Sequence, residues 1–291
     1  MQDSLNYKVN PKENIYFLIK VVIAILVVLM ILSSLYTISK LLDMSVLFAN
    51  PTLIVIGFYM TLIILFLLFR HAVFIGYIKG NGVQINKNQF PDIYETIENQ
   101  SKQLGLKQTP KSYILQQGGL LNAFATRFIG TNYVIIYSDV LEEAYENNKE
   151  SVDFIIGHEL GHIKRNHLSK RLWTLPSLVI PFLDAAYSRA CEYTCDSIGA
   201  SLSPKGVRNG LVLLASGKKL YHRVQFNSLM NQGNHEGGFW YWFSEKISSH
   251  PHLVKRLYPF AENEYSVNNV FVKPKNVVKT EEENHDRFLP Q

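Results

Sequence analysis

The chain has 291 residues, a formal net charge of +5 and a charged fraction of only 18%. This length allows one sizeable domain with appendages. The basic residues are scattered along the chain, whereas nucleic-acid-binding proteins gather them on one face, so we do not expect nucleic acid as a partner. The chain has two cysteines, Cys191 and Cys195, spaced like neighbours on one helix. A disulfide framework is therefore not indicated.

Two long apolar runs lie near the N-terminus, at residues 15–36 and 47–69. At 1.5 Å per residue, the first run would extend about 33 Å as a helix, which matches a bilayer core of about 30 Å. Its one charged residue, Lys20, is close enough to the end to snorkel. Buried core helices rarely stay uncharged for so long, and the first run exceeds the apolar part of a typical signal peptide. We therefore predict two transmembrane helices within a membrane anchor at residues 1–79.

The basic residues around these runs predict the orientation of the anchor. The connecting segment 37–50 has only Lys40, whereas both outer flanks carry several basic residues: Lys8, Lys12 and Lys20 before the spans, and Arg70, Lys79 and Lys87 after them. Positively charged flanks remain on the cytoplasmic side of a membrane. The sequence thus predicts a multi-pass protein of the cell membrane with both termini and the remaining domain in the cytoplasm.

Segments of mixed character follow the anchor. Residues 80–91 are rich in turn formers, and residues 90–106 have the apolar spacing of a helix. Two strands are expected at residues 111–117 and 132–138, on either side of a loop at 118–126, as a small sheet or hairpin. A helix is then expected from Ser138 or Asp139 through Tyr145.

The second half of the chain is expected to be mainly helical. Helices are predicted at residues 151–167, 189–199 and 205–220. Between the first two of these, the apolar segment 172–187 is too short and too interrupted by proline for a confident third span, so we expect it to pack on the core or to lie at the membrane surface. Residues 227–239 are Gly- and Asn-rich and predict a loop, and residues 261–291 form a polar tail.

The segment IIGHELGHIKRNH (155–167) carries the strongest chemical signal. His158 and His162 are four residues apart, so on a helix both project from one face, with Glu159 beside the first. This is the H-E-x-x-H arrangement in which two histidines bind zinc and the glutamate acts as general base. Gly157 and Gly161 each cost a helix about 1 kcal/mol, which is reasonable if another segment must approach the backbone closely.

A catalytic zinc requires a third protein ligand and an open position. The metzincin continuation of the motif fails, because its glycine and histidine positions hold Arg165 and Leu168. His167 falls one residue early, and we expect it not to bind metal. Segment 188–200, SRACEYTCDSIGA, offers Glu192 as the ligand, and Asp196 one turn later could accept the free N–H of a zinc-bound imidazole.

Four motifs in order resemble the M48 family of membrane zinc metallopeptidases, which includes HtpX-, Ste24- and Oma1-like proteases. In chain order, these motifs are LNAFAT (121–126), HELGH (158–162), SRACEYTCDSIGA (188–200) and SSHPHLVKR (248–256). The resemblance covers about residues 90–260. It implies a mainly α (α+β) fold: two N-terminal transmembrane helices, then a gluzincin-type helical metalloprotease domain at residues 80–260 with a small β-sheet or hairpin.

The resemblance also implies the roles of individual residues. One zinc ion per subunit would be held by His158, His162 and Glu192, with Glu159 as general base and His250 as a donor to the developing oxyanion. Further support would come from Asp196 and Arg256, and the substrate would pair with an edge formed by Asn122, Ala123, Phe124 and Ala125. Cys195 stands where the family has alanine, either as a small buried thiol or as an extra ligand. The segment 168–187 is shorter than the corresponding hairpin of HtpX-like members.

The sequence therefore predicts a membrane-bound zinc endopeptidase whose substrates are unfolded or membrane proteins, with a role in membrane-protein quality control. Two alternatives remain. One is a prenyl-protein protease of the Ste24 type, although two spans cannot build the membrane chamber of that fold. The other is a non-catalytic membrane adaptor or chaperone-like module with a degenerate site.

Overall fold

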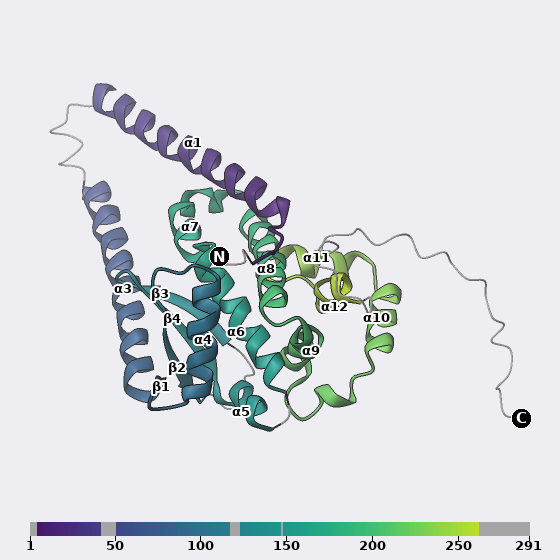
Figure 1. The fold of residues 1–291 in the computed structure, drawn as a ribbon. Helices are drawn as coiled ribbons and strands as arrows, with labels where there is room; N and C mark the ends of the chain where they lie inside the picture. Colours follow the sequence, from purple (N-terminus) through teal and green to yellow (C-terminus); the bar gives the residue numbers. More distant parts are fainter. Residues whose placement is uncertain (1–4, 42–50, 117–122, 147, 262–291) are drawn as a thin grey trace, which may run out of the picture.

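The computed structural model describes residues 5–41, 51–116, 123–146 and 148–261. Within them the chain is mostly helical with a small four-stranded sheet (Figure 1), which confirms the predicted fold class. The elements of the first half are α1 (Pro11–Leu41), α3 (Pro51–Asn81), β1 (Val83–Ile85), α4 (Pro91–Gln103), β2 (Lys111–Leu115), β3 (Ala123–Phe128), β4 (Thr131–Tyr137) and α5 (Ser138–Glu146). Those of the second half are α6 (Lys149–Lys164), α7 (His167–Trp173), η1 (Leu175–Val179), α8 (Leu183–Leu202), η2 (Pro204–Gly206), α9 (Val207–Ser216), η3 (Tyr221–Arg223), α10 (Phe226–His235), α11 (Phe239–Ile247), α12 (Leu253–Leu257) and η4 (Tyr258–Phe260).

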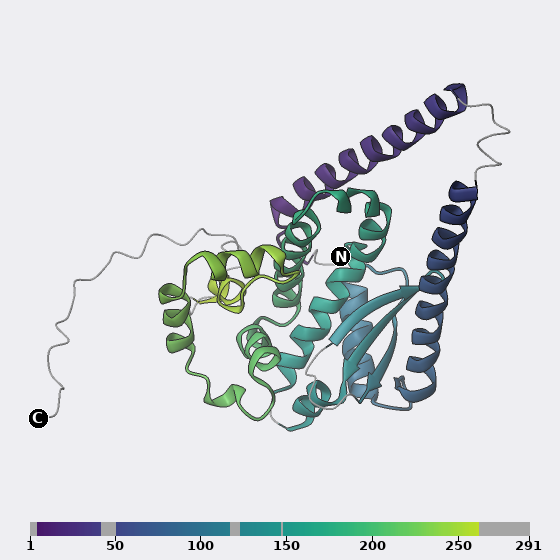
Figure 2. The same cartoon turned by 180° about the vertical axis from the view of Figure 1, so that it is seen from behind.

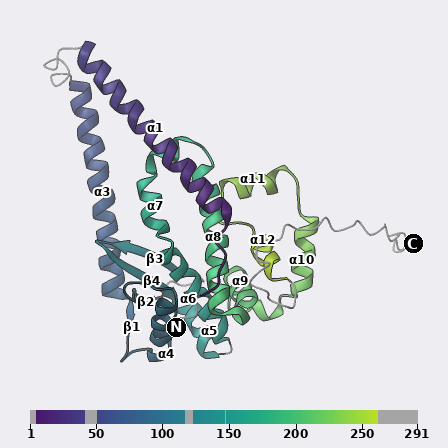
Figure 3. The same ribbon diagram turned by 45° about the horizontal axis from the view of Figure 1, so that its top comes forward.

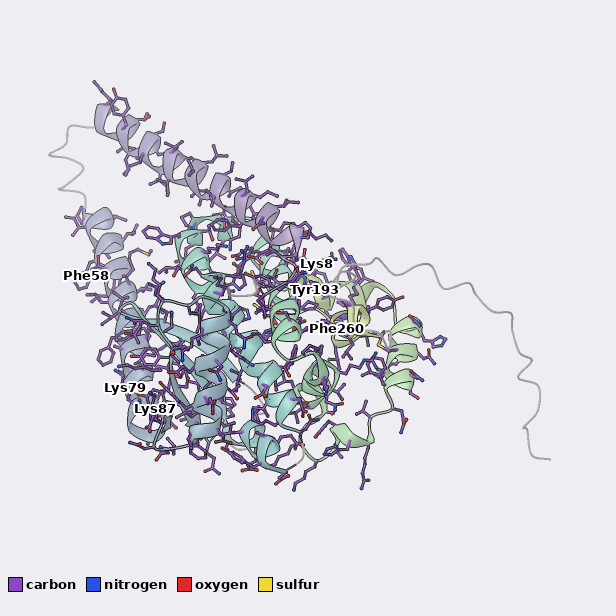
Figure 4. All side chains as sticks on the ribbon, viewed as in Figure 1. Lys8, Phe58, Lys79, Lys87, Tyr193 and Phe260 are labelled. Carbon is purple, nitrogen blue, oxygen red and sulfur yellow. The ribbon has the colours of Figure 1, made fainter. Side chains whose placement is uncertain are left out.

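The helices α1 and α3 are long and apolar enough to cross a membrane. Only 11% and 6% of their most apolar windows are buried, so neither is the core helix of a soluble domain. Both helices extend beyond the predicted spans, because residues 37–41 continue α1 and residues 70–81 continue α3. Figure 4 shows Phe58 on the part of α3 that projects beyond the sheet, whereas Lys79 and Lys87 lie near its other end. Residues 42–50 lie outside the described part of the chain.

The C-terminal half of α3 packs against the sheet (Figure 2). Ile75 and Ile78 are fully buried there in one cluster with Tyr113, Tyr133 and Ile135. This packing explains why the helix continues past Arg70, where the sequence pattern of a membrane span ends. The domain limits at residues 79 and 260 stay predictions.

The sheet has the strand order β1-β2-β4-β3. β2 and β4 pair in parallel, with Lys111 opposite Tyr133, so these two strands do not form a hairpin. Instead β3 pairs antiparallel with β4, with Ala123 opposite Ile136, and occupies the edge. The predicted loop at 118–126 is therefore wrong from Ala123 onward, since the antiparallel pairing recruits its end as a strand. Residues 117–122 lie outside the described residues.

Side chains of β4 alternate between the two faces of the sheet, as expected for a strand buried on both sides. Val134 and Ile136 join the main core with Ile156 and Leu160 of α6, whereas Ile135 faces the cluster with α3. The sheet is thus enclosed between the second apolar helix and the helix that carries the HELGH motif. This arrangement fixes β3, the edge strand, beside α6.

Two predictions for the second half of the chain are corrected by the structure. Residues 226–235 form α10 where a loop was expected, because Leu229 and Met230 pack on the core and Gly233 sits where a Cβ would meet Val254 at 2.3 Å. The helix expected at 151–167 ends at Lys164, and a new helix starts at His167 after Asn166 adopts a left-handed conformation with φ 53°.

The beginning of the chain packs along α8. The backbone N–H of Lys8 donates to Ser197 Oγ over 2.9 Å, and that of Asn10 donates to Thr194 Oγ1 over 3.0 Å. Lys20 does not snorkel as expected, because its side chain is fully buried and pairs with Asp184 at the start of α8. The first turns of α1 are thereby docked on the helical domain before the helix leaves it.

Candidate active site and metal centre

Helices α6 and α8 approach closely because small residues line their contact. A Cβ on Gly157 would lie 3.1 Å from the Cα of Gly199, and a Cβ on Gly161 would lie 3.2 Å from Cys195 Sγ. The two glycines of the HELGH region therefore have the packing role that their helix-forming cost suggested. The close approach brings Glu192 of α8 to the face of α6 that carries His158 and His162.

Three side chains from these helices form an almost equilateral triangle, in which each imidazole nitrogen faces one of the two oxygens of the carboxylate. His158 Nε2 lies 3.3 Å from His162 Nε2 and 3.4 Å from Glu192 Oε2, and His162 Nε2 lies 3.4 Å from Glu192 Oε1. A tetrahedral zinc ion with bonds of about 2.0–2.1 Å keeps its donor atoms about 3.3–3.4 Å apart. Two imidazoles and a carboxylate at this separation therefore fit zinc in both chemistry and spacing.

The electrostatics of this triangle favour a cation. Burial lowers the pKa of His158, but its contacts with the carboxylates of Asp196 and Glu192 outweigh burial and raise that pKa to about 10. Burial acts in the opposite direction on Glu192, whose pKa is nevertheless held well below its usual value by His158, His162 and Arg256. The buried carboxylates thus attract positive charge to the ring nitrogens, which a proton or a metal ion can supply.

Glu159 follows His158 in sequence and lines the same cavity. Burial raises the pKa of its carboxyl above the usual value, against the opposing charges of His158 and His162, and the backbone of Ala125 hydrogen-bonds to it. The contact with Ala125 places the carboxyl between α6 and the edge strand β3. A buried carboxylate with a raised pKa, beside a metal site, has the properties of a general base.

The candidate ligands open into a cavity of about 560 Å³. One wall is the edge strand, through Ala123, Phe124 and Ala125, and other walls come from α7 and from the loop before α12. Three of the four residues expected to bind substrate therefore border the cavity, and the fourth, Asn122, lies outside the described residues. An edge strand beside a buried site can pair with an extended peptide.

A carboxylate orients His158. The Nδ1 atom of His158 lies 2.9 Å from Asp196 Oδ1, one turn after Glu192 on α8, as its spacing predicts. Arg256 of α12 holds Asp196 in a two-point ion pair with distances of 2.7 and 2.9 Å. Its guanidinium also lies 3.5 Å from Glu192 Oε2. The pKa of Asp196 is lowered by this pair although burial alone would raise it.

His162 contacts a different set of residues, which no motif in the sequence indicates. His167 Nδ1 lies 3.0 Å from His162 Nδ1, and His167 Nε2 lies 3.2 Å from Glu13 Oε1. Glu13 is fully buried in the first turn of α1, where Arg165 donates to it over 3.0 Å. His167 is thus one step away from the triangle, and its predicted absence from the metal ligands stays a prediction, since Glu13, His167 and Cys191 also form a group that could hold an ion. The one sequence signal for Glu13 is an acidic residue just before a long apolar run.

Cys195 and His250 lie at the margin of the triangle. Cys195 is buried, and one group of atoms within 4.8 Å of one another includes its sulfur with His158 and His162. Burial raises the pKa of this thiol well above its usual value. The Glu192 carboxylate is the candidate third donor on geometry, because its two oxygens lie 3.4 Å from the two imidazole Nε2 atoms. His250 comes from the loop between α11 and α12, and its Nε2 lies 3.6 Å from Glu192 Oε1 with a side chain that is 61% exposed. It borders the cavity from the solvent side.

Comparison with known proteins identifies the family that part of the chain resembles. Residues 87–183 match the model of peptidase family M48, a segment that includes HELGH and ends before Glu192. This match confirms the resemblance indicated by the motifs and supports a metallopeptidase. None of the curated proteins matches the chain. Among solved structures, the crystal structure of Ste24p from S. mikatae is similar with a TM-score of 0.48 and 16% identity, over 87% of this chain and 67% of that one.

Proposed function

We propose that this protein is a membrane-anchored zinc endopeptidase. The observation that carries the proposal is the triangle formed by His158, His162 and Glu192, with Glu159 beside it in a cavity bordered by an edge strand. His158, His162 and Glu192 would hold a zinc ion, which would act as a Lewis acid and lower the pKa of a bound water to about 7. The M48 match of residues 87–183 supports the same class of chemistry.

The protein's own groups have defined tasks in this proposal. The Glu159 carboxylate takes a proton from the attacking water and delivers it to the leaving amine. The imidazole of His250, which faces Glu192 from the cavity rim, donates a hydrogen bond to the oxyanion of the tetrahedral intermediate. The backbone of Ala123–Ala125 aligns an extended segment of substrate along β3, so an unfolded or flexible region is required.

The orientation of the two ligand histidines belongs to the same proposal. Each neutral imidazole binds metal through Nε2 only when its Nδ1 carries the proton, which a hydrogen-bond acceptor at Nδ1 secures. Asp196 is that acceptor for His158. For His162 the acceptor is His167, which in turn is fixed in this tautomer when its Nε2–H donates to Glu13. These residues position the ligands and do not contact the reacting atoms.

The test compares the full-length protein with Glu159→Gln and a matched control, Glu150→Gln, which changes an exposed residue on the same helix. Zinc content and hydrolysis of casein or an unfolded membrane protein are measured together. We expect Glu159→Gln to retain zinc and lose about 10²–10⁴-fold in rate, because only the general base is removed. Full hydrolysis by Glu159→Gln would contradict the proposal. Wild-type protein that lacks zinc and hydrolysis but binds unfolded protein would indicate the adaptor alternative.

The proposed location is the cell membrane, with the site and both termini in the cytoplasm. This orientation rests on the basic residues that flank the two apolar helices. A site so placed meets the cytoplasmic segments of membrane proteins, which supports a role in their quality control. Reporters placed at residue 45 and at the C-terminus test the topology. A C-terminal reporter outside the cytoplasm would contradict it.

A further inference from the structure

The segment after α7 has an inverted pattern of burial. Thr174 and Ser177 are almost fully buried, and the Ser177 hydroxyl donates to the Thr174 carbonyl over 2.7 Å. The apolar side chains around them point outward instead: Leu172, Trp173, Leu178 and Val179 are all more than half exposed. A turn that satisfies its polar groups internally and exposes its apolar ones is not suited to contact with water.

The helix α11 continues this apolar surface. Trp240 is 76% exposed and Trp242 is 52% exposed, although both are large aromatic residues. The rings of Phe182, which precedes α8, and Phe243 of α11 have centroids 6.1 Å apart, so the two segments meet. We call the side chains of Leu172, Trp173, Leu178, Val179, Phe182, Phe239, Trp240 and Trp242 the aromatic rim.

The aromatic rim lies beside the part of α1 where its long apolar run begins. α1 packs against η1 and α8, and the ion pair of Lys20 with Asp184 fixes this contact just after Phe182. Lys170 of α7 lies over the ring of Phe17, with its Nζ 5.0 Å from the ring centroid. Figure 3 shows α7 and α11 on the side of the domain from which α1 extends. The rim is therefore continuous with the start of the first candidate span.

We propose that the aromatic rim is a membrane-contact surface that rests in the headgroup region of the bilayer crossed by α1 and α3. Tryptophan favours this depth, because its ring is apolar and its N–H remains near the polar groups. A basic residue at the border of the rim fits an anionic headgroup layer, since Lys246 Nζ lies 5.5 Å from the ring of Trp242. Arg171, also at this border, is half exposed and pairs with Asp184 at 2.5 Å. The occupant of this face is the lipid leaflet.

This contact has a consequence for substrate access, which rests on the proposed function. Leu168 and Arg171 of α7 line the catalytic cavity, and Leu172 and Trp173 of the same short helix belong to the rim. One wall of the cavity is therefore shared with the membrane-contact surface. A peptide segment that emerges from the lipid beside α7 is then presented to the cavity directly, whereas a freely soluble peptide must approach from the opposite side.

The chain's own fluorescence tests the membrane contact. Its three tryptophans, Trp173, Trp240 and Trp242, are all members of the rim. Full-length protein is reconstituted in nanodiscs of phosphatidylcholine and phosphatidylglycerol, with acyl chains either brominated near the headgroup or unmodified. We expect bromine to quench most of the emission, because side chains at the interface lie within about 5–10 Å of the headgroup boundary. Equal emission in the two lipids would overturn the proposal.

Variants and a second quencher separate the alternatives. Trp173→Phe leaves the α11 pair as reporters, and the double variant Trp240→Phe, Trp242→Phe leaves Trp173, so each half of the rim is read separately. Protection from iodide without quenching by bromine would show that another protein copy covers the rim, and would overturn the proposal. Glu159→Gln protein should be quenched as strongly as wild type, so failure of the catalytic proposal remains distinguishable from failure of this one.

Discussion

The two histidines of HELGH lie one turn apart on α6, yet different parts of the molecule orient them. The contacts of His158 are confined to the catalytic core, since Asp196 comes from α8 and Arg256 from α12. The contacts of His162 lead through His167 to Glu13 in the first turn of α1. The first set of contacts, which we call the core arm, depends on the packing of the domain alone. The second set, the anchor arm, depends on how the membrane helix is docked, so the anchor is connected to the candidate metal site by these contacts.

The largest effect is expected for Glu192→Ala, which removes the ligand common to both arms. Two imidazoles alone bind zinc weakly, so we expect loss of bound zinc and of all hydrolysis. Zinc is measured by mass spectrometry of the purified full-length protein together with the proteolysis assay. Glu98→Ala, a change on α4 outside the cavity lining, is the control and should leave both unchanged. Zinc retained at wild-type level would rule out Glu192 as a ligand.

Arg256→Gln should lower the stability of the metal-free protein by about 3 kcal/mol, at the lower end of the range for a broken buried pair, because the buried Asp196 carboxylate then keeps only His158 as a charged partner. The folded-state pKa of Asp196 lies below 3.8, so the pair stabilises fully above that pH and its contribution is lost as the pH falls through the folded pKa. Thermal unfolding of both proteins in detergent is compared near neutral pH and well below 3.8. The difference in stability between wild type and Arg256→Gln should shrink in acid. A difference that does not change with pH would contradict a stabilising ion pair between Arg256 and Asp196.

Asp196→Asn tests the core arm itself. We expect zinc to bind about 10–100-fold more weakly, because the Nδ1 proton of His158 loses its carboxylate acceptor. The affinity is measured by competition with a chelator of known strength. Cooperative thermal unfolding of the variant establishes that the loss is not due to misfolding. Unchanged zinc affinity would mean that Asp196 acts only through its pair with Arg256.

Glu13→Gln tests the arm that reaches the membrane helix. We expect about a 10-fold loss of zinc affinity, at the lower end of the range for such changes, because Glu13 acts on His162 only through His167. Lys12→Gln, an exposed neighbour in the same turn, is the matched control. If Glu13→Gln lowers the zinc affinity more than Asp196→Asn does, the predicted order of the two effects is wrong. If it has no effect, His167 orients His162 without Glu13.

The smallest effect is expected for Cys195→Ala, which introduces the residue that the M48 resemblance implies for this position. The protonated thiol packs against Gly161 and lies 3.7 Å from His167 Nδ1. We expect zinc affinity to change less than about twofold and stability to fall by about 1 kcal/mol from the lost packing. A large loss of zinc would make Cys195 a ligand.

Much of the fold and of the site could be predicted because it depends on short-range periodicity. The i, i+4 spacings of His158 with His162 and of Glu192 with Asp196 determine which side chains share a helix face. Local sequence predicts loops where the structure has the beginning of β3 and α10, because pairing with β4 and packing on Val254 override weak local propensity. His167 was placed on the wrong helix because the left-handed turn at Asn166 has no strong sequence signal.

The sequence by itself determined the two apolar helices, the ligand-bearing faces of α6 and α8, and the charge that surrounds them. Only the tertiary structure decided that Glu13 reaches His167, that β3 is the edge strand beside the cavity, and that the side chains after α7 face outward. The physical reason is the range of the forces involved. Helix geometry sets contacts one turn apart, whereas 152 residues separate Glu13 from Arg165, and they meet only because α1 docks on α8.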